Sequence, residues 1–267
     1  MSARAEGTVA PAVVDPSTVV IRALATLEER EQAVALQEAT WGAGFKERIP
    51  AAMLLIAEKT GGVAGGAFAP DGHMLGFVFG VVGGAFDPDG RLLGFVFGMV
   101  GVRNGALFHW SDMLALVPEA RGSGLAERLK HWQADQCRAL GIREMVWTFD
   151  PLVARNAWFN LRRLKAEIAE YVENVYGVTD SPLMGPIPTD RFVARWRLDG
   201  PTVPRTEAPW TLALPADFEA LVRNDPAAAA AARFAFRDAV QAHAAAGRHV
   251  VGITRGPEGT AYLLDTR

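Results

Sequence analysis

Residues 118–126 have the sequence Pro-Glu-Ala-Arg-Gly-Ser-Gly-Leu-Ala and lie between an apolar segment, 106–117, and an amphipathic segment, 125–140. The first segment has the composition of a strand, and the second has the apolar spacing of a helix. Gly122 and Gly124 let the backbone approach a ligand closely, and the free N–H groups at the start of a helix favour an anion. The stretch therefore predicts a strand, turn and helix whose turn binds a diphosphate.

Two common nucleotide motifs do not fit this turn. Glu127 stands where the third glycine of a Gly-x-Gly-x-x-Gly dinucleotide fingerprint is expected. The Gly-Lys-Ser/Thr ending of a P-loop is also missing, so a redox dinucleotide or a nucleoside triphosphate is disfavoured. The alternative without a ligand is a tight turn that only joins a strand to a helix.

Further elements surround this unit. Thr26 is a candidate N-cap with glutamates in the following turn, and Asp150 with Pro151 resembles the start of another helix. Apolar patterns place strands at 19–22, 142–149, 168–173 and 192–198, and helices at 27–36, 50–59 and 150–164. The order predicts a mixed α/β fold.

Residues 65–82 and 83–100 are near copies that differ at only four of 18 positions. Each copy has the pattern of a strand, a Pro-Asp-Gly turn and a second strand. Two units are too few for a solenoid or a propeller. Because one extra strand would reverse the direction of everything after it, we expect the additional copy to form a projecting pair or loop; a functional flap is the alternative.

The chain divides into three predicted parts. Residues 1–18 form a loose tail, residues 19–199 the main domain, and residues 200–267 an accessory α/β lobe. A Pro-containing linker at 200–209 precedes a strand at 210–214, an alanine-rich helix at 226–246 and a closing hairpin at 250–264.

Composition excludes several classes of protein. The 27 Lys and Arg against 30 Asp and Glu give a net charge of -3, so nucleic acid is not an expected partner. The longest apolar run, 74–86, is shorter than the roughly 20 residues of a membrane span, and the first 20 residues lack the apolar core of a secretory signal. The single cysteine, Cys137, indicates a reducing, cytoplasmic setting, and no residue cluster has the spacing of a metal site.

The Arg-x-x-Gly-x-Ala pattern at Arg121, Gly124 and Ala126 resembles the GNAT (GCN5-related N-acetyltransferase) superfamily, and the order of elements over 19–198 strengthens the resemblance. The resemblance implies that the strand before the turn diverges from the strand after the helix, and that acyl-coenzyme A lies between them. Pantetheine would then meet Leu116 and Val117. The diphosphate would meet Arg121, Gly122, Ser123, Gly124, Leu125 and Ala126.

The segment 154–164 resembles the family's helix beside the thiol and implies contacts from Asn156 and Phe159. It departs from the family in one respect, because Leu161 stands where many members have a tyrosine that protonates the leaving thiolate, with Asn160 next to it. The chain is similar to an uncharacterised branch of the superfamily that carries a C-terminal extension.

Candidate catalytic residues lie near the turn. Strand alternation puts positions 112, 114 and 116 on one face and 109, 111 and 113 on the other, so Asp112 and His109 do not share a face unless a bulge intervenes. We favour Asp112 as the base, with Glu119 as a second candidate that also suits a solvated helix entry. Tyr171 and Tyr176 are candidate acids, although tyrosines there also suit packing.

These observations predict an acyl-coenzyme A dependent N-acyltransferase that uses no metal. Acetyl-coenzyme A is the default co-substrate, and a succinyl or other acyl group is left open. The acceptor is the primary amine of a small molecule, for which an amino acid is one candidate, and a homodimer is left open. The alternatives are a catalytically silent acyl-coenzyme A sensor or scaffold, and an interaction module without a ligand.

Overall fold

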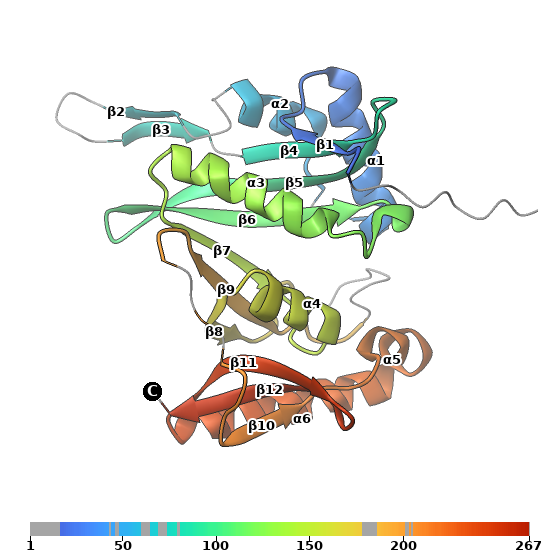
Figure 1. Ribbon diagram of the computed structural model, residues 1–267, viewed down its shortest axis with the longest axis vertical. Coiled ribbons are helices and arrows are strands. Elements are labelled where there is room, and N and C mark those ends of the chain that lie inside the picture. The colour runs from blue at the N-terminus through green and yellow to red at the C-terminus, as the bar shows by residue number, and fades with distance from the viewer. Residues whose placement is uncertain are drawn as a thin grey trace, which may run out of the picture.

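A computed structural model (Figure 1) describes residues 17–42, 44–45, 48–59, 65–68, 74–78, 81–177, 186–200, 203 and 205–266, with the backbone alone for 57–59, 65–68 and 74–78. Most of the expected tail at 1–18, the glycines after the second helix and most of the loop at 181–188 lie outside the described residues.

In the described part of the chain, one mixed sheet of seven strands runs in the order β1-β4-β5-β6-β7-β9-β8. Neighbouring strands are antiparallel except β6 and β7, which are parallel and are connected through helix α3. This confirms the mixed α/β class and the order of elements that the GNAT resemblance implies. The strands are β1 (Val20–Arg22), β4 (Val81–Phe86), β5 (Leu92–Arg103), β6 (Ala106–Leu116), β7 (Glu144–Phe149), β8 (Glu167–Val172) and β9 (Arg191–Arg197).

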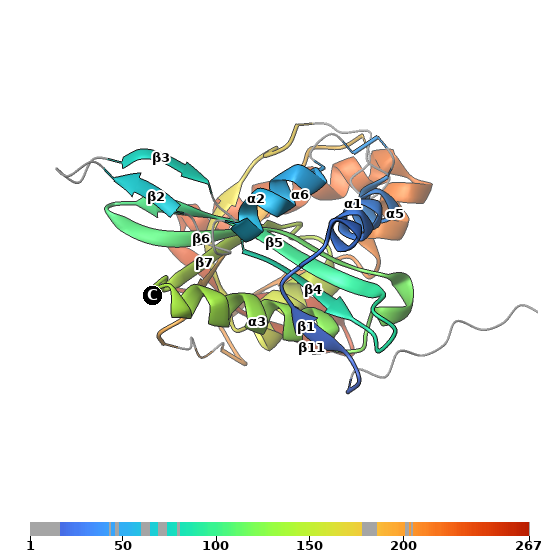
Figure 2. The same cartoon turned by 90° about the horizontal axis from the view of Figure 1, so that it is seen from above.

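Helices cover both faces of this sheet. Helices α1 (Leu27–Trp41) and α2 (Ala51–Lys59) lie on one face, and α3 (Leu125–Ala139) lies on the other (Figure 2). Thr26 caps α1 as expected, because its hydroxyl accepts from the Glu29 amide while the Glu29 carboxylate accepts from the Thr26 amide. The seam between α3 and the sheet is apolar, with Leu125 and Leu129 fully buried.

The duplicated segments form two hairpins with the same register. In the first copy, strands β2 (Gly65–Phe68) and β3 (Met74–Val78) pair Gly65 with Val78 and shift register before Phe68. In the second copy, β4 and β5 make the same pairing 18 positions later and shift register at the matching place. The first hairpin forms its own two-stranded sheet beside the main one (Figure 1), which confirms the expected projecting pair.

The expected single helix over 150–164 is wrong in two ways. Asp150 is not its N-cap: the helix α4 (Ala154–Trp158) begins after Val153, because the Asp150 carboxylate binds the Leu152 amide and the guanidinium of Arg233. After α4 the chain continues as a π-helical turn, η2 (Phe159–Arg163). A π-turn adds one residue and so changes which side chains face the sheet.

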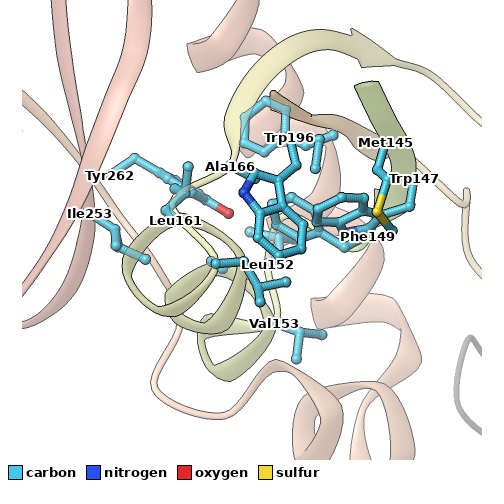
Figure 3. Close-up of a cluster of buried hydrophobic side chains, with 14 of the residues drawn as sticks. Met145, Trp147, Phe149, Leu152, Val153, Leu161, Ala166, Trp196, Ile253 and Tyr262 are labelled. Atoms are coloured by element: carbon cyan, nitrogen blue, oxygen red, sulfur yellow. The ribbon is translucent and has the colours of Figure 1, made fainter. Parts of the chain in front are cut away.

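The accessory lobe comprises β10 (Trp210–Ala213), α5 (Phe218–Asn224), α6 (Pro226–Ala245), β11 (Arg248–Gly256) and β12 (Gly259–Thr266), with its strands in the order β10-β12-β11. Its core is continuous with that of the main sheet: Ile253 and Tyr262 lie beside Leu161 of η2 (Figure 3). The buried Tyr262 hydroxyl also donates to the Pro151 carbonyl at 2.7 Å.

A short 3-10 helix, η1 (Pro118–Ala120), precedes the glycine turn. None of the helices in the described ranges is long and apolar enough to cross a membrane.

Candidate active site

The parallel strands β6 and β7 pair over a very short distance. His109 pairs with Met145 and Trp110 with Val146, and the described pairing ends there. Both strands continue toward their carboxyl ends, β6 to Leu116 and β7 to Phe149. The two strands therefore diverge at the level of Ser111 and Trp147, as the GNAT resemblance implies.

A cavity of about 350 Å³ occupies this divergence and reaches both faces of the sheet. Trp41 and Phe45, whose rings stack with centroids 5.2 Å apart, form its wall on the side of α1. Side chains of α3, α4 and η2 line it on the other side. Two ligands could thus approach the same point from opposite faces of the sheet. The remaining lining residues include Ser111, Asp112, Lys130, Trp147, Asn156, Phe159, Asn160 and Tyr176.

A β-bulge in β6 lies at the start of the divergence. Trp110 pairs with Met99 and Met113 with Phe97, so two residues of β6, Ser111 and Asp112, oppose the single Gly98 of β5. The bulge that the sequence left open is therefore present, and it interrupts the alternation along β6. Ser111 faces α3 before the bulge, and Leu114 and Leu116 face it after the bulge, whereas Asp112 lies on the cavity.

Beyond the bulge, one edge of β6 presents backbone groups to the gap beside β7. The Val117 amide donates to the Leu93 carbonyl at 2.9 Å, which fixes the alternation of the antiparallel pair. By that alternation the N–H and C=O groups of Leu114 and Leu116 point away from β5. The Val117 backbone is bonded within the protein, because its carbonyl also accepts from the Ala120 amide at 3.0 Å, so the contact of Val117 with pantetheine stays a prediction for its side chain.

The glycine turn has the backbone that the sequence predicts. Gly122 and Gly124 have φ values of +77° and +84°, the left-handed region that glycine tolerates best. Within the described ranges, no acceptor bonds the amides of Gly122, Ser123, Gly124 or Ala126. Unbonded N–H groups at the first turn of a helix favour an anion.

The amides of Arg121 and Leu125 do not belong to that set. The Arg121 amide donates to the Pro118 carbonyl at 3.2 Å, and the Leu125 amide donates to the Ser123 hydroxyl at 3.3 Å. The Ser123 hydroxyl itself donates to the Ala120 carbonyl at 2.7 Å. The Ser123 hydroxyl thus stabilises the turn through two hydrogen bonds within it. The Arg121 side chain is exposed.

Asp112 is the candidate base that lies on the cavity. Its carboxylate retains contact with solvent, yet surrounding protein raises its pKa by desolvation, an effect that a hydrogen bond from Trp110 partly opposes. A carboxylate with a raised pKa is a stronger proton acceptor than an ordinary surface aspartate.

The other two expected catalytic residues lie elsewhere. Glu119 pairs with Arg91 on the surface of η1, away from the cavity lining, and its pKa is lowered by a backbone hydrogen bond and by this guanidinium. The Tyr171 hydroxyl donates to the Asp190 carboxylate, and burial together with this hydrogen bond raises the pKa of the phenol. Asp190 in turn pairs with Arg237 of the lobe. We therefore remove Glu119 and Tyr171 from the site.

His109 is also unsuited to act as the base. Its ring is fully buried against Gly98, outside the cavity lining, and burial lowers its pKa to about 3. Neither ring nitrogen has a partner in the described part of the chain. Cys137, as expected, is a buried apolar residue whose pKa burial raises to about 12.

Asn156 and Phe159 line the cavity, where the resemblance placed them. Tyr176 also lines it, and its hydroxyl lies 2.9 Å from that of Thr148, so of the two candidate acids Tyr176 is the one on the cavity. Leu161 is buried in the core, whereas Asn160 faces the cavity and accepts from the Trp147 indole at 3.0 Å.

Sequence reasoning missed Lys130, which is 3% exposed and lines the cavity. A signal for it was present. Lys130 stands four and seven positions before Ala134 and Cys137, which are also buried, so helical periodicity places it on the inner face of α3.

No family model matches the chain, and no curated protein matches it. Solved structures with similar folds include an N-acetyltransferase from Staphylococcus aureus Mu50, with a TM-score of 0.48, 15% identity, and coverage of 67% of this chain and 98% of that chain. Arabidopsis thaliana Naa50 in complex with a bisubstrate analogue gives a TM-score of 0.47 at 16% identity, with coverage of 67% and 97%. The PaiA N-acetyltransferase from Thermoplasma acidophilum in complex with coenzyme A gives 0.45 at 14% identity, with coverage of 67% and 98%.

The diverging parallel pair, the bulge and the glycine turn before α3 occur here in one chain and in the expected order. The chain has a GNAT-type fold.

Proposed function

We propose that the protein is an acyl-coenzyme A dependent N-acyltransferase that acts on the primary amine of a small molecule. The observation that carries the proposal is the combination of four unbonded amides at the start of α3 with a cavity that crosses the sheet between β6 and β7. The amides suit a diphosphate. The free edge of β6 suits an extended amide-containing tether that adds to the sheet like a strand.

The donor would enter from the side of α3. Its diphosphate would receive N–H groups from Gly122, Ser123, Gly124 and Ala126, and its pantetheine would pair with the free edge at Leu114 and Leu116. Asn156 and Phe159 line the end of this path. The acceptor amine would enter from the opposite face, past the stacked rings of Trp41 and Phe45.

The chemical step is an attack of the amine nitrogen on the thioester carbonyl. The C–N bond forms, the C–S bond breaks, and the amine loses a proton to Asp112, directly or through water. A backbone N–H at the free edge of β6 would stabilise the oxyanion. Tyr176 would donate a proton to the leaving thiolate and take the role that the resemblance assigns to a tyrosine at position 161.

A pair of variants at the turn tests donor binding. Space around the Gly122 Cβ position is open, and both Asn and Asp tolerate its left-handed φ better than most residues do. Gly122→Asn and Gly122→Asp therefore differ mainly by one negative charge. We expect the Asp variant to bind coenzyme A about 10- to 100-fold more weakly than the Asn variant, as one like charge a few ångströms from a diphosphate implies.

Pantetheine, which lacks the diphosphate, is the control ligand and is expected to bind both variants equally. Equal affinity of the two variants for coenzyme A would refute the diphosphate site. Thiol release from acetyl-coenzyme A with a panel of amines then tests catalysis. Binding without release of thiol would favour the silent sensor over the enzyme.

A further inference from the structure

Lys130 places a buried ammonium group at the point where β6 and β7 separate. Its Nζ donates to the Ser111 hydroxyl at 2.7 Å and lies 4.0 Å from the centroid of the Trp147 ring. The side chain is 3% exposed and lines the cavity. Burial lowers the pKa of Lys130 to about 7. A lysine in such a position is normally paired with a carboxylate.

No carboxylate pairs with Lys130 in the part of the chain that the structure describes. The polar groups packed around it are neutral. Ser111 donates its own proton to the Gln133 side-chain oxygen at 2.6 Å, so Ser111 only accepts from Lys130. His109, with its lowered pKa, and Cys137, with its raised pKa, carry no charge at neutral pH.

Hydrogen-bond donors that have no acceptor lie at this end of the cavity. An ammonium has three N–H bonds, and the contacts of Lys130 with Ser111 and the Trp147 ring account for two. Asn160, on the other side of the same indole, uses its oxygen to accept from the Trp147 N–H. Its NH₂ group has no hydrogen-bond partner among the described residues, and Asn160 lines the cavity.

We propose that Lys130 and Asn160 form a receptor for a carboxylate at the far end of the donor's acyl group, so that the preferred donor is the coenzyme A thioester of a short dicarboxylic acid. The inference rests on the proposed function, because α3 covers the face from which the donor would enter. An acyl chain that follows the free edge of β6 away from the glycine turn ends at the point of separation, beside Lys130. A terminal carboxylate would supply the counter-charge that no described residue gives the Lys130 ammonium, whereas a plain acetyl group would not.

Succinyl-coenzyme A and butyryl-coenzyme A provide a matched pair of probes. Their acyl chains have the same length and differ in a terminal carboxylate against a methyl group. We expect kcat/KM with a common amine to be about 100-fold higher for the succinyl donor, in the range measured for one buried hydrogen-bonded charge pair. Equal rates, or a preference for butyryl, would overturn the inference.

Two variants assign the preference to the proposed receptor. Lys130→Met keeps the volume and removes the charge, so it should lose the succinyl preference, measured as the ratio of kcat/KM for the succinyl and butyryl donors. Asn160→Asp keeps an acceptor for Trp147 and adds a negative charge beside Lys130, so it should also lose the preference. If both folded variants keep a succinyl preference of the original size, Lys130 and Asn160 are not the receptor.

Binding measurements distinguish a failure of the proposed function from a failure of the carboxylate receptor alone. If coenzyme A itself does not bind to the unsubstituted protein, the proposed function fails. If coenzyme A binds but succinyl-coenzyme A binds no more tightly than butyryl-coenzyme A, and the rates agree, only the carboxylate receptor fails.

Discussion

Deletion of one copy of the duplicated hairpin tests whether the stability of the main sheet depends on the second copy alone. Removal of residues 63–80 joins Gly62 to Val81 and leaves every residue of β4 and β5 in place. Strands β2 and β3 pair in a sheet of their own, outside the main one. We therefore expect this variant to keep the stability of the full chain to within about 1 kcal/mol.

Removal of residues 81–98 is the matched deletion. It has the same length, and it forces the first copy to supply the strands that β4 and β5 now form. The two shortened chains differ only at four positions, where the second copy has Val82, Asp87, Arg91 and Leu92 and the first has Ala, Ala, His and Met. Because both copies already form hairpins of the same register, we expect the second variant to fold as well.

The contacts of these four residues allow an estimate of how much each difference lowers the free energy of unfolding. Val82 is 4% exposed, so its replacement by Ala costs about 2 kcal/mol, and a change of Leu92 to Met costs about 1 kcal/mol. Asp87 accepts from the amides of Asp89 and Arg91 at 3.1 and 2.9 Å, and loss of both bonds costs about 1 to 2 kcal/mol. The exposed pair of Arg91 with Glu119 adds little.

The variant that lacks 81–98 should therefore be about 4 kcal/mol less stable than the variant that lacks 63–80, which corresponds to a melting temperature roughly 8 to 16 °C lower. Urea unfolding followed by circular dichroism measures the difference. Equal stability of the two variants would refute the assignment of energy to these contacts. Unfolding of the variant that lacks 63–80 would refute the view that the first hairpin is dispensable to the sheet.

Three further predictions concern single side chains. Asp112→Asn should lower kcat about 100-fold or more without changing the affinity for coenzyme A, and it should remove the acidic limb of the pH–rate profile, which the raised pKa of Asp112 places above the ordinary range for aspartate; an unchanged profile would exclude Asp112 as the base. Tyr176→Phe should lower kcat, whereas Tyr171→Phe should lower stability by about 1 to 3 kcal/mol with catalysis intact, because its hydroxyl only satisfies a buried carboxylate; the reverse pattern in paired kinetic and melting assays would contradict this assignment. Thr26→Ala should cost about 1 kcal/mol in urea unfolding through loss of the capping box with Glu29, and Thr26→Ser, which keeps the hydroxyl, should restore most of it.

Elements fixed by local chemistry could be predicted from the sequence. The glycine turn needs left-handed φ values at Gly122 and Gly124, and only neighbouring atoms impose that requirement. The capping box at Thr26 and the equal registers of the two hairpins depend on residues a few positions apart. Tertiary contacts act on these segments too weakly to change them.

The catalytic assignments needed the tertiary structure. Glu119 and Tyr171 have suitable chemistry and suitable places in the sequence, but Arg91 and Asp190, both remote along the chain, bind them elsewhere. Likewise, Asp150 has the sequence context of an N-cap, yet Arg233 of the lobe holds its carboxylate. Such long-range hydrogen bonds and ion pairs leave no periodic pattern in the sequence.

By itself, then, the sequence determined the fold class, the turn that suits a diphosphate and the projecting hairpin, because each follows from backbone conformation and local periodicity. The tertiary structure alone decided the bulge at Ser111 and Asp112, the cavity across the sheet, and the place of Lys130 on that cavity rather than merely on the inner face of α3. These features depend on residues far apart in the sequence, because Gly98 of β5 lies opposite the bulge, and side chains from α1, α3, α4 and η2 line the cavity together with those of β6 and β7.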